Sequence, residues 1–383
     1  MKIKLNGELE LENLEKFTEV SSNLVNEYIN EWKDQGKKII GYTCTYAPQE
    51  LIHAAGILPY RVRGVTCSGT SNADIYMSKF NCSFCRCVLE LGLTGSYDFL
   101  DGICYLNGCD HIRRVYDNLI AHVKISFKDF LPVPHIISDE GFEYYMEGTN
   151  AFKNHIEEHF GVKITEKDLK NSIRVYNETR RLFEELYELR KRDNPPVSGA
   201  QTLSILAAST AMPREKFNSM LASLLEGLQD FEGIKDYDAR LMIAGSELDH
   251  PLLLELIEDL GGLIVTDSLC FGTRQFKGLV EEEGDPLKSI SRRYYTHNPC
   301  PRMIREYPNK LALVKELINE SKVDGAIFER ISFCDPHGVD NIMISKELEK
   351  MDIPTLVLER DYQIGDAGRF RTRVQAFLER IGG

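Results

Sequence analysis

A strand, cysteine, helix and strand pattern occurs once in each half of this 383-residue chain and leaves few folds open to it. Each copy has a predicted strand, a Cys-Asp pair, a predicted helix and a second predicted strand. These parts are residues 101–106, Cys109-Asp110 and 133–137 in the first half, and residues 324–329, Cys334-Asp335 and 353–358 in the second. Short apolar runs that alternate with helical periodicity are typical of parallel strands joined by crossover helices. We therefore expect two α/β units built on one plan.

The other apolar runs extend this α/β pattern. They predict strands at residues 38–43, 57–63, 240–245 and 262–267. Residues 10–36 and about 140–231 instead have helical spacing among many charges. The predicted organisation is an N-terminal helical lead (1–36), a first α/β domain (37–139), a helical connector (140–235) and a second α/β domain (236–383).

The composition excludes several classes of function. The formal net charge is −13, which argues against nonspecific binding to nucleic acid or anionic membranes because both require a basic surface. The N-terminus lacks the long apolar region and small-residue cleavage site of a secretory signal, so we expect a cytoplasmic protein. No window approaches the roughly 18 apolar residues that a membrane helix needs.

The placement of the ten cysteines is more informative than their number. Cytosolic cysteines are thiols, metal ligands or buried small residues rather than disulfides. Four cysteines follow predicted strands, at the sheet edge where open α/β folds bind ligands: Cys44, Cys109, Cys270 and Cys334. Cys82, Cys109 and Cys334 also precede predicted helices, whose N-termini favour anions. Cys300 lies between two prolines.

Single cysteines that converge from strand ends suit an iron–sulfur cluster held between domains. Only Cys82 and Cys85 show the tight paired spacing that is typical of zinc sites, and the closely repeated cysteines of ferredoxins are absent. A structural zinc site is therefore a third alternative. The other thiols are predicted to be small buried residues: Cys67, Cys85, Cys87 and Cys104. Cys85 stays open, because it shares a helical face with Cys82.

At the level of motifs, the chain resembles the 2-hydroxyacyl-CoA dehydratase and benzoyl-CoA reductase superfamily, of the 2-hydroxyglutaryl-CoA dehydratase D-component type. The matching motifs are residues 41–59, 109–114, 267–274 and 333–336, and the resemblance spans about residues 38 to 380. It implies two Rossmann-like (flavodoxin-like) parallel-sheet domains joined by a helical connector, with an iron–sulfur cluster between them. It also implies a partner, an ATP-hydrolysing iron–sulfur activator protein that supplies low-potential electrons.

The resemblance implies two possible cofactors. Dehydratase subunits hold one [4Fe-4S] cluster on three cysteines, which correspond to Cys82, Cys109 and Cys334. A sister branch, the double-cubane cluster proteins, adds cysteines at the positions of Cys44, Cys270 and Cys300. This chain has all six, which favours a double-cubane [8Fe-9S]-type cluster with three thiolates for each cubane.

We therefore expect an oxygen-sensitive reductase that passes ATP-driven electrons to a small molecule. The alternatives are a subunit of a 2-hydroxyacyl-CoA dehydratase or benzoyl-CoA reductase with an acyl-CoA substrate, or a non-catalytic electron-transfer protein. The chain has neither a phosphate-binding G-x-x-x-x-G-K-[ST] loop nor a G-x-G-x-x-G fingerprint, so ATP hydrolysis is expected in the partner. Both a homodimer and a heterodimer with a sister subunit are compatible with the sequence.

Other polar residues are weaker candidates for function. Gln49 and Glu50 begin a predicted helix beside Cys44 and could transfer protons to a substrate, although an acidic residue is also simply favoured in a first helical turn. Two groups of basic residues are candidates for a docking or anion patch and for CoA phosphates, respectively: His111, Arg113 and Arg114, and Arg274, Arg292 and Arg293. Exposed helix faces explain either group equally simply.

Overall fold

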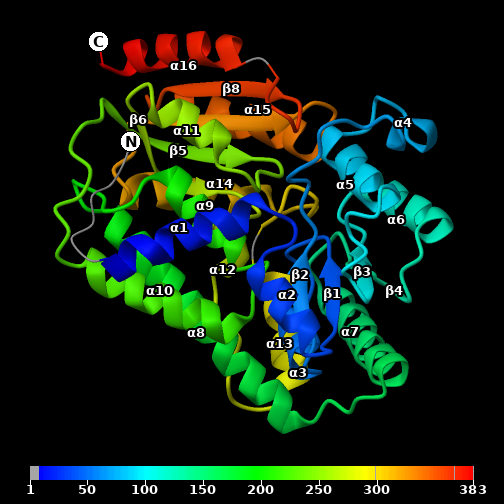
Figure 1. Cartoon of the computed structure of the whole chain (residues 1–383). Coiled ribbons are helices and arrows are strands. Elements are labelled where there is room, and N and C mark those ends of the chain that lie inside the picture. The colour runs from blue at the N-terminus through cyan, green and yellow to red at the C-terminus, as the bar shows by residue number, and fades with distance from the viewer. Residues whose placement is uncertain (1–7, 298, 366, 383) are drawn as a thin grey trace.

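The computed structural model describes residues 8–297, 299–365 and 367–382, and it contains two four-stranded parallel sheets (Figure 1). The first sheet has the order β2-β1-β3-β4, and the second has the order β6-β5-β7-β8. The strands are β1 (Ile39–Tyr42), β2 (Leu58–Arg61), β3 (Gly102–Leu106), β4 (Phe127–Leu131), β5 (Ala239–Gly245), β6 (Gly262–Ser268), β7 (Gly325–Ile331) and β8 (Thr355–Arg360). The predicted α/β class with two Rossmann-like units of one plan is confirmed.

Helices cover both sheets, and the chain between the first sheet and the second is also helical. They are α1 (Glu8–Ser22), α2 (Glu27–Asp34), α3 (Gln49–Ala54), α4 (Ala73–Tyr76), α5 (Ser83–Leu93), α6 (Asp110–His122), α7 (Asp139–Phe160), α8 (Glu166–Arg190), α9 (Gly199–Ala208), α10 (Arg214–Leu228), α11 (Leu252–Glu258), α12 (Thr273–Phe276), α13 (Pro286–Thr296), α14 (Tyr307–Glu320), α15 (Asp335–Glu349) and α16 (Ala367–Gly382). The long helices α7, α8 and α10 lie within the predicted helical connector. Figure 1 shows α1, α8 and α10 lying together below the second sheet.

The repeated Asp-Gly pair has the same structural role in both halves. Asp101 precedes β3, and its carboxylate accepts a hydrogen bond from the backbone N–H of Ile39 in the neighbouring strand β1 at 3.0 Å. Asp324 precedes β7, and its carboxylate accepts the backbone N–H of Arg240 in β5 at 2.7 Å. Each aspartate therefore fixes the start of one central strand against the other, which explains why the same local sequence occurs twice.

Each sheet is buried on both faces, as expected for parallel strands with crossover helices. One core lies between β1–β3 and helices α1, α2, α5, α8, α9 and α10, and a second core covers the opposite face of the first sheet. The second sheet likewise has one core under α9, α11 and α16 and another under α14 and α15. The predicted helical lead, of which residues 1–7 lie outside the described residues, buries Phe17, Val20 and Ile29 against this structure.

One segment of the second half packs on the first sheet. Helix α13 contacts α7 and α8, and Val280, Ile290 and Tyr294 share a core with Ile40 and Tyr42 of β1. The chain then passes through Cys300 before it returns to the second sheet as α14 and β7. The predicted domain boundaries remain a prediction, but this excursion carries Cys300 to the junction of the two sheets.

The strand predicted at residues 133–137 is wrong, because β4 ends at Leu131 and the following residues are irregular. Pro132 and Pro134 have no backbone N–H and cannot take part in a strand ladder on both sides. The carbonyl groups of this segment instead hold the chain around Cys300. Val133 O accepts a hydrogen bond from Arg302 at 2.7 Å, and His135 O accepts the backbone N–H of Ile304 at 2.7 Å.

Candidate functional site

Cysteines that lie far apart in the sequence converge on one cavity of about 120 Å3 where the two sheets meet. Its lining contains all six predicted ligands: Cys44, Cys82, Cys109, Cys270, Cys300 and Cys334. Cys85 also lines this cavity. The structure therefore brings the whole predicted set together, although Cys44 and Cys334 lie 290 residues apart in the chain.

Strand ends deliver four of these thiols, as the sequence predicted. Cys44 follows β1, Cys109 follows β3, Cys270 follows β6 and Cys334 follows β7. The carboxyl ends of the two parallel sheets thus face the same cavity. Cys82 immediately precedes α5, and Cys300 lies in the connection between α13 and α14.

A second cavity divides the six cysteines into two groups of three. It has a volume of about 360 Å3 and is lined by Cys82, Cys109 and Cys334, together with His111, Arg113 and His135. The other three predicted ligands do not line it. We call this second cavity the vestibule. The first three cysteines are the vestibule triad, and Cys44, Cys270 and Cys300 are the inner triad.

Each cysteine of the vestibule triad is the N-cap residue of a helix. Cys82 precedes α5, Cys109 precedes α6 and Cys334 precedes α15. The backbone N–H groups three residues further on, at Cys85, Ile112 and His337, face these sulfurs and favour their anionic form, although none makes a full capping hydrogen bond. Three helix N-termini therefore point their positive ends at one site, an arrangement suited to thiolates or an anionic group.

Cys85 links two members of the vestibule triad. Hydrogen bonds of its thiol lower the pKa of Cys109 and lower the pKa of Cys82 to about 5, and they raise the pKa of Cys85 itself. His111 also favours the Cys82 thiolate, and its Nδ1 accepts the backbone N–H of Cys82 at 3.2 Å. Cys334 differs, because burial and the nearby Cys82 raise its pKa. The sequence left Cys85 open, and only its three-residue spacing from Cys82 indicated this position.

Within the inner triad, Cys300 influences the pKa values of the other two thiols. Burial, followed by the charge of Cys300, raises the pKa of Cys44. Burial also raises the pKa of Cys270, with a further contribution from Cys300 and an opposing one from Arg274. Cys300 is thus the common neighbour of the other two thiols. Arg61, at the end of β2, donates a hydrogen bond to the backbone carbonyl of Cys270 at 2.7 Å.

Two buried arginines beside the cavity have no carboxylate partner among the described residues. Arg274 donates to the Gly245 carbonyl at 2.8 Å, and Arg302 donates to the Val133 carbonyl at 2.7 Å. Their exposed fractions are 4% and 7%, and the Nε atoms of both, like that of Arg61, are buried without a hydrogen-bond partner in the described structure. Arg302 lines the cysteine cavity, whereas Arg274 lines a smaller neighbouring one. Burying an unpaired charge is costly, so both guanidinium groups fit an anionic group close by.

The remaining cysteines lie away from the cavity. Cys104 is fully buried within β3. Cys67 and Cys87 form a hydrogen-bonded pair, and Cys87 lines a different cavity with Arg86 and Arg369. Cys87 and Cys104 are buried, as predicted, whereas Cys67 is only half-buried and the prediction of a buried residue is wrong there.

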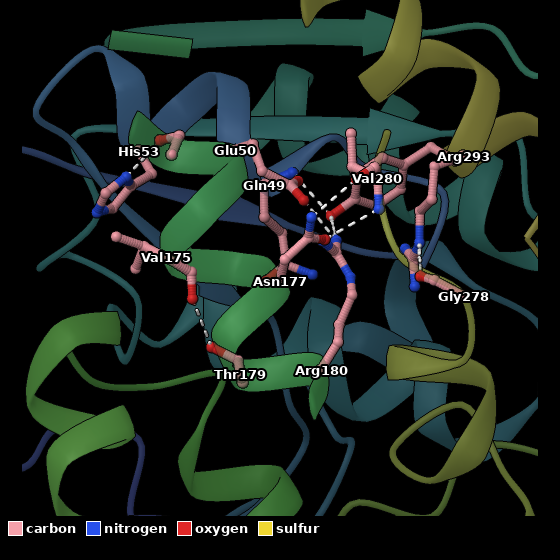
Figure 2. Close-up of polar contacts among 12 residues, drawn as sticks. Gln49, Glu50, His53, Val175, Asn177, Thr179, Arg180, Gly278, Val280 and Arg293 are labelled. Carbon is pink, nitrogen blue, oxygen red and sulfur yellow. Dashed lines mark hydrogen bonds and ion pairs between the residues drawn. The ribbon is translucent and has the colours of Figure 1, made fainter. Parts of the chain in front are cut away.

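Gln49 and Glu50 do not line the cysteine cavity, and Figure 2 shows Glu50 directed toward Arg180 of α8. Glu50 is fully buried and forms an ion pair with Arg180, and the Gln49 side chain accepts a hydrogen bond from Arg214 at 3.0 Å. Burial would raise the pKa of Glu50, but Arg180 and Arg293 hold it below its usual value. Neither residue lines the cysteine cavity or the vestibule, so this geometry favours a structural role over the predicted proton transfer.

The predicted basic groups are dispersed. His111 and Arg113 line the vestibule, whereas Arg114 points to solvent and pairs with Asp117. Arg274 is buried as described above, and Arg293 donates to the carbonyl groups of Gln275, Lys277 and Gly278. Of the three arginines considered for CoA phosphates, Arg292 alone is exposed; it stacks over Phe142 at the edge of a cavity of about 540 Å3.

The site does not resemble one for a single metal ion. Within residues 8–297, 299–365 and 367–382, no three His, Cys, Asp or Glu side chains lie close enough to bind one ion together. Cluster ligands each bind a different iron atom and therefore lie further apart. None of the helices in these ranges is both long and apolar enough to cross a membrane.

Comparison with known proteins now identifies the family. Residues 44–381 match the model of the 2-hydroxyglutaryl-CoA dehydratase D-component. The chain belongs to this family. It is 29% identical to a benzoyl-CoA reductase subunit of Thauera aromatica over 92% of this chain and 93% of the relative. It is 26% identical to the (R)-phenyllactyl-CoA dehydratase beta subunit of Clostridium sporogenes, over 95% of this chain and 97% of the relative.

A third relative also matches nearly the whole chain. The beta subunit of the (R)-2-hydroxyglutaryl-CoA dehydratase of Acidaminococcus fermentans is 26% identical over 96% of this chain and 98% of its own length. All three relatives are named as subunits of dehydratases or reductases. The resemblance found in the sequence motifs is therefore confirmed, and the chain is a component of an enzyme of the 2-hydroxyacyl-CoA dehydratase type.

Proposed function

We propose that this chain is an oxygen-sensitive reductase component that reduces a small molecule at a double-cubane [8Fe-9S]-type cluster held by six cysteines. The observation that supports it is the convergence of both triads on one cavity. A subunit with one [4Fe-4S] cluster needs only three thiolates, and the vestibule triad supplies those. The inner triad would then be a second complete set of ligands without a function.

The chemistry of the cavity fits such a cofactor. The six thiols are soft ligands that suit iron–sulfur clusters. Three helix N-termini and the buried Arg274 and Arg302 would offset the negative charge of a thiolate-bound cluster. When bound, the cluster would supply the one-electron chemistry, and the protein would hold it, exclude water and balance its charge.

Electrons would reach the site from an ATP-hydrolysing iron–sulfur activator protein. The chain itself has no nucleotide-binding motif in its sequence. The vestibule opens beside the triad of Cys82, Cys109 and Cys334, so electrons and substrate both have a route from that side. A sister subunit or a second copy of this chain would complete the enzyme, in line with the subunit names of the relatives.

The alternative is a dehydratase or benzoyl-CoA reductase subunit with one [4Fe-4S] cluster on the vestibule triad and an acyl-CoA substrate. Two observations favour it: only this triad lines the vestibule, and the relatives are named for CoA thioesters. In that case the inner triad would remain as thiols, and its buried arginines would lack an anion.

Iron and sulfide analysis of the chain purified without oxygen separates these proposals. We expect about eight iron atoms per chain for two cubanes and about four for one. The variant Cys300→Ser sharpens the test, because it removes the common neighbour of the inner triad and leaves the vestibule triad intact. A loss of about half the iron supports the double cubane, and no loss supports the single cluster. A protein with no iron in any preparation would contradict both.

Activity is tested separately, with an activator protein, ATP and a low-potential reductant. Turnover of small molecules without a CoA group supports the leading proposal, and turnover of 2-hydroxyacyl-CoA or aryl-CoA thioesters supports the alternative. Iron-loaded protein that transfers electrons but converts neither class of substrate would contradict both catalytic proposals.

A further inference from the structure

The positive charges around the cavity are distributed unevenly between the two triads. Arg61 donates a hydrogen bond to the Cys270 carbonyl, and Arg274 lines a small cavity together with Pro299 and Pro301, the two neighbours of Cys300. Both arginines are almost completely buried, with exposed fractions of 1% and 4%. The vestibule is lined by the carboxylates of Asp110 and Asp335, by the half-buried His111 and by Arg113, which pairs with Asp110. The buried Arg302 lines both cavities, so it does not distinguish the two triads. The inner triad therefore has the more positive surroundings.

Of Arg61 and Arg274, only Arg274 lacks a carboxylate partner within the described residues. Arg61 forms an ion pair with Glu247 at 2.6 Å, so its charge is largely compensated. Arg274 forms no ion pair within the described residues, and its NH2 group bonds only to the Gly245 carbonyl. Burial lowers the pKa of Arg274, but the charges of Cys270 and Cys300 outweigh burial and raise it. These two inner thiols are therefore its main electrostatic partners.

The fold holds Arg274 rigidly at this place. It belongs to the short helix α12, four residues after Cys270. Asp267 fixes the intervening turn, because its Oδ1 accepts the backbone N–H of Thr273 at 2.9 Å and its carbonyl accepts the Thr273 hydroxyl at 2.8 Å. A bulky residue at Gly272 would collide with the Asp267 carboxylate. This turn fixes the backbone at Arg274, and burial and the hydrogen bond to the Gly245 carbonyl hold its side chain.

We propose that Arg274 raises the reduction potential of the cluster half bound by Cys44, Cys270 and Cys300 above that of the half bound by the vestibule triad. This inference rests on the proposed function, in which both triads hold iron. The reduction potential of an iron–sulfur cluster rises when nearby positive charge stabilises the added electron, most strongly where water is excluded. One electron leaves a low-potential iron–sulfur donor protein at the vestibule side, and the guanidinium group stabilises the negative charge that arrives. Arg274 thus acts through its charge on the reduction potential of the cluster half, and it transfers no proton.

The test is an anaerobic redox titration of the full-length, iron-loaded protein, followed by electron paramagnetic resonance. The wild type is expected to show two separable reduction steps. In Arg274→Gln, at a fixed solution potential, the ratio of reduced to oxidised protein in the first step should fall about tenfold, which is about 59 mV for one electron. Arg274→Lys keeps the charge and should restore most of this loss. The matched control Arg114→Gln removes an exposed charge on α6 that is screened by water, and it should shift neither step.

The outcomes distinguish this inference from the proposed function. An unshifted first step, or a larger shift of the second step, overturns the role of Arg274 even when about eight iron atoms are present. If Arg274→Gln loads no iron in the inner site, a loaded Arg274→Lys protein supports the role of charge, and an unloaded one overturns it. A wild-type protein with about four iron atoms or none overturns the double-cubane proposal and this inference together, and the iron count identifies that case.

Discussion

The two four-stranded sheets share one strand order but differ in their cysteines. The equivalent strands β3 and β7 are each followed by a cysteine that begins a helix, Cys109 and Cys334. The other strand ends do not match. Cys44 follows β1, whereas the equivalent strand β5 is followed by Ser246 and Glu247. Cys270 follows β6, whereas the equivalent strand β2 ends at Arg61.

The strand ends that carry a cysteine in only one sheet show how the two halves form one site. At one mismatched position, the sheet that lacks the cysteine supplies a group that contacts the cysteine of the other sheet. Arg61 of the first sheet donates to the Cys270 carbonyl and pairs with Glu247, both of the second half. The vestibule triad is thus built around an equivalent pair of strand ends, while the inner triad depends on contacts between unlike ones.

The largest expected effect is a loss of bound iron, and it tests whether the cysteines after the equivalent strands β3 and β7 have the same role. Cys109→Ser and Cys334→Ser should cause the same loss of at least half of the bound iron, because each removes one of three ligands of the vestibule triad. Iron and sulfide per chain, measured on protein prepared without oxygen, check this. Cys67→Ser is the control, since its thiol lies outside both cavities and should leave the iron content unchanged.

Two outcomes would break this comparison. Unequal losses for Cys109→Ser and Cys334→Ser would mean that the matching positions of the two sheets do not carry matching roles. A loss in Cys67→Ser as large as in the other two would mean that iron content follows the total number of thiols rather than the cavity.

The repeated plan of the fold could be predicted because its signals are local. The Asp-Gly pairs and apolar runs mark β3 and β7, and four of the cysteines were placed correctly at strand ends. The strand expected at residues 133–137 failed, because Pro132 and Pro134 outweighed its apolar composition. The carbonyl groups there found partners in a segment about 170 residues away, such as Arg302. Local sequence contains no signal for such contacts.

The same limit applies to the site. The cysteines that follow strands were predictable from topology, and the family resemblance implied the two groups of three that the vestibule lining separates. Arg61 and Arg302 had no distinguishing sequence signal, because an arginine is usually exposed and these two are buried by tertiary contacts. Arg274 was noticed for a different role, and its burial removes it from contact with a solvated phosphate.

A second difference between the sheets lies in their ion pairs. Glu329 of β7 and Arg360 of β8 form a fully buried pair at 2.7 Å, whereas the paired ends of β3 and β4 are Leu106 and Leu131. Glu329→Gln should lower the free energy of unfolding by about 3–5 kcal/mol, because it leaves the Arg360 charge buried and uncompensated. Denaturant unfolding of the purified protein measures this change.

The control for this prediction is the neighbouring pair of Arg330 and Glu359, which is half exposed. Glu359→Gln should cost about 0–1 kcal/mol, as is usual for surface ion pairs. Equal losses in Glu329→Gln and Glu359→Gln would show that burial does not set the strength of the pair, and the contrast between the sheets would disappear.

The smallest expected effect concerns the two aspartates that precede β3 and β7. Burial alone would raise the pKa of Asp101, but hydrogen bonds from Lys33, the backbone of Ile39 and Lys38 outweigh it and lower the pKa. A carboxylate with a lowered pKa in the folded state stabilises the protein above its unfolded pKa of about 3.9, and this stability is lost as the pH falls through the folded value. Asp101→Asn should therefore cost about 1 kcal/mol near neutral pH, and this loss should shrink as the pH falls below about 3.9.

Asp324→Asn is the matched variant, because Asp324 makes the same backbone hydrogen bond but has no lysine partner in the described structure. Unfolding measured between pH 3 and pH 7 should show a clear pH dependence of the loss for Asp101→Asn and a weaker one for Asp324→Asn. If both losses depend equally on pH, the backbone hydrogen bond accounts for the whole effect and the lysines contribute nothing. If neither depends on pH, the carboxylate charge has no role at these strand starts, and the repeated Asp-Gly pair acts through its hydrogen-bonding shape alone.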